Sequence, residues 1–68
     1  MAFEIALENA ADVTPECLAR AIDLVVRELE GSLIESIWFG DDFLSVETFG
    51  QRHHIDFPVI RTGDHHAH

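Results

Sequence analysis

The sequence predicts a small α+β domain: a mostly antiparallel sheet of about four strands, in the order β-α-β-β-β, with one helix packed on one face. Three observations support this prediction. Strand-like alternation near the start gives way to a helical spacing of apolar residues, the spacing then returns to that of strands, and glycines separate the segments. Residues 1–61 are expected to form this single compact domain, and residues 62–68 a flexible His-rich tail.

The first strand and the helix follow from local patterns. Residues 3–8 alternate apolar with acidic or small side chains, as in a half-buried strand. A helix is predicted from about Pro15 to Glu30, because Thr14 can cap it, proline suits its first position and Gly31 can end it. Its buried stripe is expected to contain Leu18, Ala21, Ile22, Val25, Val26 and Leu29.

Three further strands are predicted after the helix. Residues 34–39 and 43–49 are rich in β-branched and aromatic side chains, and Gly40-Asp41-Asp42 between them suits a hairpin turn. Gly50-Gln51-Arg52 is a second turn signal. The last strand is predicted over residues 53–60, at an edge of the sheet because Pro58 cannot donate to a strand ladder.

Both faces of the predicted hairpin carry large apolar side chains. One helix can cover only one face of a sheet. The other face is then buried by sheet twist and the chain ends, used for self-association, or offered to a foreign protein. The alternation assigns Ile37, Phe39, Leu44 and Val46 to one face, and Ile34, Trp38, Phe43 and Phe49 to the other.

Catalytic patterns are weak in this chain. His54 and Asp56 share a strand face and could form half of a general-base pair. The available nucleophiles, Ser36, Ser45 and Cys17, do not lie in a recognisable nucleophile turn, and a lone helical cysteine is expected to be a buried structural thiol. The chain is therefore expected not to be an enzyme.

Histidines provide the strongest pattern for metal binding. Imidazole suits zinc, nickel and copper, but a flexible end lacks the outer contacts that fix the ligands of a structural site. Neither a physiological metal site nor a cofactor is therefore expected. The residues concerned are Asp64, His65, His66 and His68, with His53 and His54 earlier in the chain.

The net charge of the chain argues against nucleic-acid-binding and lipid-binding proteins. Asp and Glu number 13 against 4 Lys and Arg, so the net charge is −9 over 68 residues. Such a chain repels nucleic acid and anionic lipid, and direct binding to either is not expected. No stretch approaches the ~18 apolar residues of a membrane span, and the N-terminus does not resemble a secretory signal, so a cytoplasmic location is expected.

A short, acidic chain with a small α+β core resembles the phage-encoded anti-CRISPR inhibitors, several of which act as DNA mimics on CRISPR effectors. The resemblance is one of profile and includes no shared motif. It implies an acidic inhibitor that blocks a basic, nucleic-acid-binding surface of a partner complex, most concretely a CRISPR effector subunit. The alternatives are an immunity or antitoxin protein that neutralises a basic toxin, which has the same profile, and a small structural homodimer.

Residues for such a partner surface can be proposed from their positions. Acidic residues that alternate with apolar ones on strands, or lie in the hairpin turn, would provide attraction to a basic partner. Apolar groups on the uncovered face would act as anchors or dimer contacts. The acidic set is Glu4, Glu8, Asp41, Asp42, Glu47 and Asp56, and the apolar set is Trp38, Phe43 and Phe49.

Overall fold

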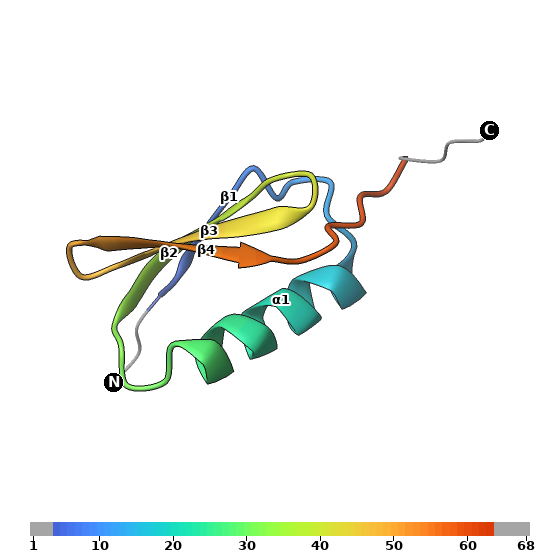
Figure 1. The fold of residues 1–68 in the computed structure, drawn as a ribbon. Coiled ribbons are helices and arrows are strands. Elements are labelled where there is room, and N and C mark those ends of the chain that lie inside the picture. Colours follow the sequence, from blue (N-terminus) through green and yellow to red (C-terminus); the bar gives the residue numbers. More distant parts are fainter. Residues whose placement is uncertain (1–3, 64–68) are drawn as a thin grey trace.

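The computed structural model describes residues 4–63 and contains one helix and a four-stranded mixed sheet, which confirms the predicted α+β class and element order (Figure 1). The strands lie side by side in chain order. The first pair is parallel and the other two pairs are antiparallel. The elements are β1 (Ala6–Glu8), α1 (Pro15–Glu28), β2 (Ile34–Phe39), β3 (Phe43–Thr48) and β4 (Gln51–Asp56).

The helix begins as predicted and ends slightly earlier. Thr14 Oγ1 accepts a hydrogen bond of 3.2 Å from the Cys17 amide, and proline occupies the first turn. The last helical residue is Glu28, two before the predicted end, because Leu29 already leaves the helical conformation at φ −115° and ψ 36°. Gly31 then adopts a left-handed φ of +91°, which lets the chain turn toward β2.

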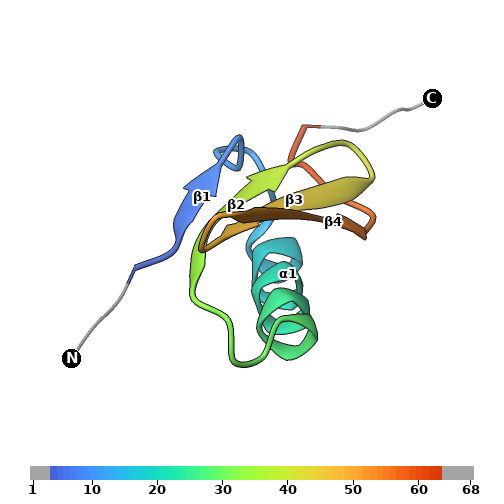
Figure 2. The same ribbon diagram turned by 60° about the vertical axis from the view of Figure 1, so that its left-hand side comes forward.

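The helix packs on one face of the sheet through a narrow stripe (Figure 2). Cys17, Ala21 and Val25 are fully buried at four-residue steps. Val26, which the sequence placed in the same stripe, is 47% exposed, because one further step of about 100° turns it away from the sheet. The sheet residues of this core are Ile37, Phe39, Leu44 and Val46, which confirms the predicted inner face.

One predicted side-chain direction is wrong. Simple alternation predicts that Ile34 shares a face with Trp38, but Ile34 packs against the core. A register shift between Ile34 and Ser36 breaks the alternation and pairs Ile34 with buried Thr48 on the helix side.

The second hairpin turns earlier than predicted. Thr48 pairs with Gln51, so Phe49 and Gly50 form the turn, and Gly50 adopts a φ of +76°. The turn was predicted at positions 50–52 and the last strand at 53–60. Both lie nearer the N-terminus in the structure, because Gln51 is already paired as a strand residue. The last strand, β4, does lie at an edge of the sheet, as Pro58 indicated.

The segment after β4 is tied to the rest of the fold. The amides of Phe57 and Val59 donate to the carbonyls of Asp42 and Asp41, and Thr62 donates to the carbonyl of Asp12. The tail predicted from position 62 thus begins with a hydrogen-bonded residue. Positions 64–68, which include the tail histidines, lie outside the described residues. Within residues 4–63, no helix has the length and apolar character needed to span a membrane.

Candidate functional site

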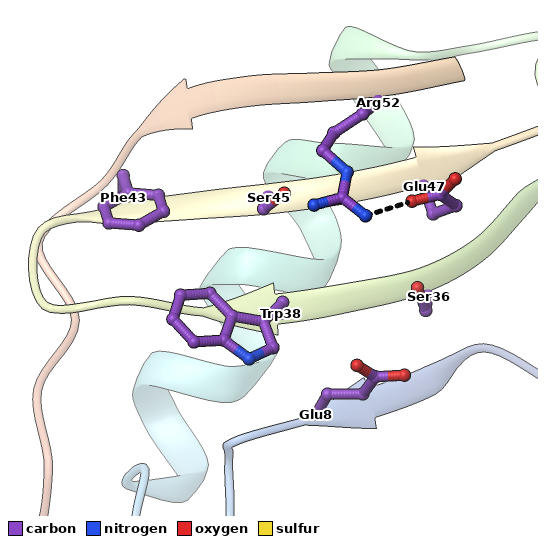
Figure 3. A pocket seen from close by; sticks show the side chains of 7 residues that line it. All are labelled: Glu8, Ser36, Trp38, Phe43, Ser45, Glu47 and Arg52. Atoms are coloured by element: carbon purple, nitrogen blue, oxygen red, sulfur yellow. Dashed lines mark hydrogen bonds and ion pairs between the residues drawn. The ribbon is translucent and has the colours of Figure 1, made fainter.

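The sheet face opposite α1 is uncovered in the part of the chain that the structure describes, and we call it the open face (Figure 2). Strand alternation brings side chains from all four strands to it. In the close view of Figure 3, the helix passes behind the sheet and the labelled side chains lie in front of it. We define the open face as Glu8, Ser36, Trp38, Phe43, Ser45, Glu47, Arg52, His54 and Asp56.

Three aromatic rings form a row across the open face. The rings of Phe43 and His54 are stacked, with centroids 4.8 Å apart and planes at 13°. The Trp38 ring lies 5.8 Å from Phe43 on the other side, tilted by 35°. This row runs across β2, β3 and β4, and Trp38 remains 40% exposed. An aromatic surface of this size on the face without a helix is a candidate for contact with another molecule.

The aromatic row depends on Gly40. A Cβ at Gly40 would lie 2.5 Å from Cζ of Phe43, so the ring occupies the space that any other residue would need. We expect Gly40→Ala to push the ring aside, break its stacking on His54 and lower the free energy of unfolding by about 2 kcal/mol. The measurement is urea denaturation combined with the fluorescence of Trp38, which is the single tryptophan of the chain.

Gly50→Ala is the matched control for this prediction. Nothing lies within 4 Å of a Cβ at Gly50, and its φ is +76°. That variant should lose about 1 kcal/mol through backbone strain and leave the Trp38 emission spectrum unchanged. If Gly40→Ala also leaves the emission unchanged, Gly40 does not position the aromatic row.

Beside the aromatic row lies a hollow of about 330 Å³, shown in Figure 3. Two small side chains line the hollow: Ser45 lies between Phe43 and Arg52, and Ser36 lies beside its cross-strand partner Glu47. At the charged end, Arg52 donates to Oε1 of Glu47 at 3.1 Å. The other lining residues are Glu8, Trp38 and Phe43. The hollow is thus bordered by aromatic rings on one side and by two carboxylates and a neutralised arginine on the other.

The predicted His–Asp pair does form. His54 Nε2 lies 3.2 Å from Oδ1 of Asp56, and the two side chains are 65% and 96% exposed. No hydrogen bond joins His54 to a serine within residues 4–63, and Cys17 is buried on the helix side with its Sγ accepting from the Ile60 amide at 3.3 Å. Ser45 is the cross-strand neighbour of His54 on the open face, but within residues 4–63 none of the three candidate nucleophiles is hydrogen-bonded to the His54–Asp56 pair.

The two strand histidines do not converge on a metal site. His53 faces the helix side, where its Nε2 lies 2.9 Å from Oγ1 of Thr48, whereas His54 lies on the open face. In the described range 4–63, no three His, Cys, Asp or Glu side chains are placed to hold a metal ion together.

The predicted partner-binding residues fall into three groups. Glu8, Trp38, Phe43 and Glu47 line the hollow, and Asp56 is the cross-strand partner of Phe43. The turn residues Asp41 and Asp42 lie at the Phe43 end of the open face. The remaining two are displaced, because Phe49 is in the β3–β4 turn, 79% exposed, and Glu4 precedes β1.

Sequence reasoning missed four members of the open face. The sequence pattern indicated His54 only as a candidate general base or metal ligand, whereas its ring completes the aromatic row. Alternation along the strands could have placed Ser36, Ser45 and Arg52 on the same face, but only once the register between strands was known.

The few basic groups are mostly neutralised by ion pairs. Arg27 lies 3.4 Å from Asp23, Arg52 lies 3.1 Å from Glu47 and Arg61 lies 2.6 Å from Asp12. Within residues 4–63, Glu8, Asp41 and Asp42 have no such partner. The uncompensated charge around the open face is therefore negative.

No family model matches the chain, and neither the curated proteins nor the solved structures gave a match.

Proposed function

We propose that this protein is a non-enzymatic acidic inhibitor that binds a basic, nucleic-acid-binding surface of a partner protein through its open face. The observation that supports this most is the exposed row of Trp38, Phe43 and His54, surrounded by carboxylates. The row offers apolar contact area, and the carboxylates select the charge of the partner.

The aromatic row suits a protein partner. Binding energy at protein interfaces concentrates in a few central aromatic or arginine side chains surrounded by a polar rim. Trp38 and Phe43 lie toward the β2–β3 turn end of the open face, and the hollow beside them can receive a side chain of the partner. A guanidinium group from the partner would fit, because it can stack on an aromatic ring and pair with Glu8, which has no ion-pair partner within residues 4–63.

The surrounding charge favours a basic partner. Glu8 borders one end of the hollow, Asp56 lies beside Phe43, and Asp41 and Asp42 lie in the adjoining turn. The arginine on this face, Arg52, is neutralised by Glu47. Together with the net charge of −9, this arrangement would repel acidic proteins and speed association with basic ones.

A nucleic-acid-binding surface is the most concrete basic partner. Such surfaces display lysine and arginine at the spacing of phosphates, about 3.4 Å per strand of DNA. One strand places acids on a face only every ~6.6 Å, so matching a phosphate row needs several elements. The open face and its turn provide acids from β1, β3, β4 and the β2–β3 turn. An anti-CRISPR-like DNA mimic would use this arrangement.

Charge reversal tests the proposal. Asp41→Lys/Asp42→Lys should reduce the association rate with the partner at least about tenfold, since attraction at the rim mainly sets the on-rate. The bait is the immobilised chain in a bacterial lysate that expresses candidate nucleic-acid complexes. Bound proteins are eluted with a salt gradient or with double-stranded DNA, then purified for kinetic measurements against each variant.

The matched control is Glu28→Lys/Glu30→Lys, which changes the net charge equally but on the helix side of the molecule. It should retain the partner, while Trp38→Ala should lose it. A basic nucleic-acid-binding protein that DNA displaces, with this order of effects, supports the proposal. Equal losses in both charge variants, or a partner indifferent to DNA, contradict it. A captured basic toxin would favour the immunity-protein alternative.

A further inference from the structure

The outer edge of β4 carries unpaired backbone groups. β4 has β3 as its strand neighbour and forms the end of the sheet. Beyond β4, the amides of Phe57 and Val59 donate to the carbonyls of Asp42 and Asp41, so odd-numbered residues of this segment point toward the β2–β3 hairpin. Successive residues of a strand point their backbone groups to opposite sides. The amides and carbonyls of Arg52, His54 and Asp56 therefore point outward.

The hairpin geometry agrees with this assignment. Thr48 and Gln51 pair across a two-residue turn, and in such hairpins the pair that closes the turn exchanges hydrogen bonds. Gln51, His53 and Ile55 then bond inward to β3. In the described part of the chain, no group outside the strand ladders is bonded to the outward backbone groups of β4. A strand edge of this kind is a template for pairing with another strand.

We propose that β4 pairs antiparallel with β4 of a second copy of this chain, about a two-fold axis through His54. In this register His54 lies opposite His54 of the second copy, and Arg52 lies opposite Asp56 of the second copy. Each outward-pointing residue then faces another outward-pointing residue, so all of their amides and carbonyls can bond across the interface. The interface is self-complementary, as a two-fold axis requires.

Side-chain charge selects this register. Arg52 and Asp56 both lie on the open face, so directly opposite positions bring their charges together across the interface. If the second strand is shifted by two residues in one direction, Arg52 lies opposite His54 of the second copy. A further shift of two residues places Arg52 opposite Arg52 of the second copy. A shift in the other direction brings Pro58 opposite Arg52, and Pro58 has no amide to donate. The proposed register forms the most backbone bonds and is the one that pairs opposite charges.

The helix side of β4 is compatible with this contact. His53 would lie opposite Ile55 of the second copy, so the half-buried Ile55 side chain gains an additional neighbour. The two sheets would join into one, with both helices on the same side and both open faces on the other. This inference does not depend on the proposed function, and its test needs no foreign partner.

Exchange of the paired charges tests the interface. Arg52→Asp puts the introduced aspartate opposite Asp56 of the second copy, and Asp56→Arg puts the introduced arginine opposite Arg52 of the second copy. Each single variant should therefore be a monomer, because like charges face each other. An equimolar mixture of the two single variants should form a dimer, because every opposite pair again combines an acid with an arginine. The double variant Arg52→Asp/Asp56→Arg should dimerise alone for the same reason.

The measurement is sedimentation equilibrium over micromolar to millimolar concentrations, with circular dichroism to confirm that each variant is folded. The unmodified chain should approach twice its monomer mass of 7.7 kDa. A chain that stays monomeric at the highest concentration overturns the proposal. Dimers that survive in both single variants, or folded single variants that do not associate when mixed, overturn the proposed register. The mixture also controls for the loss of the Arg52–Glu47 ion pair, because the Arg52→Asp chain still lacks that ion pair when it is mixed with the Asp56→Arg chain.

Discussion

Phe39→Ala should lower the free energy of unfolding by about 4 kcal/mol, since it removes a large aromatic side chain from a closed core. Phe39 is completely buried and lies against the helix stripe. In a chain of this length the net stability is about 5 kcal/mol or less, so the variant should be largely unfolded at physiological temperature. Urea denaturation followed by far-UV circular dichroism measures this loss.

Trp38→Ala is the matched control, because Trp38 precedes Phe39 in β2 and points to the other face. It should cost about 1 kcal/mol, mainly through its contact with Phe43. The variants of these two adjacent aromatic residues would thus distinguish an effect on stability from an effect on binding. Phe39 stabilises the core, and Trp38 contributes to the open face. Equal losses of stability would contradict a core confined to the helix side.

Arg61→Met should cost about 3 kcal/mol, the second largest effect we expect. The Arg61 guanidinium donates to Oδ1 of Asp12 and to the carbonyls of Asn9, Phe39 and Gly40, at distances of 2.6–3.2 Å. Its side chain is only 16% exposed. Methionine keeps much of the apolar stem but removes the guanidinium donor, and of these four acceptors only the Phe39 carbonyl keeps another side-chain donor within residues 4–63, Nδ2 of Asn9 at 2.7 Å. Thermal and urea unfolding measure the loss.

Arg27→Met provides the contrast for this prediction. Arg27 also pairs with an aspartate, Asp23, but the two side chains are 76% and 66% exposed. Its removal should therefore cost only about 0.4 kcal/mol. Arg61→Lys should recover little of the lost stability, since an ammonium group cannot reach acceptors on both the loop after β1 and the β2–β3 turn in the way a planar guanidinium does. Similar costs for the two arginine-to-methionine variants would show that Arg61 is not a structural clamp.

These predictions follow from features that the sequence determined to different degrees. Local patterns were enough for the elements themselves: Thr14-Pro15 marked the start of the helix, and the alternation of Ile37, Trp38 and Phe39 identified a strand with two apolar faces. Such signals act over a few residues and do not depend on distant partners. The fold class and a hairpin with large apolar side chains on both faces could therefore be predicted from the sequence, whereas the sequence left open whether the second face is covered.

Only the tertiary structure decided how distant segments meet. Arg61 carried no local signal, yet it joins the chain end to the loop after β1 and to the β2–β3 turn. The register shift that moved Ile34 to the core, and the grouping of Glu8 with Trp38 and Glu47, depend on how strands align. Register is set by long-range pairing and side-chain fit, which neither propensity nor periodicity encodes.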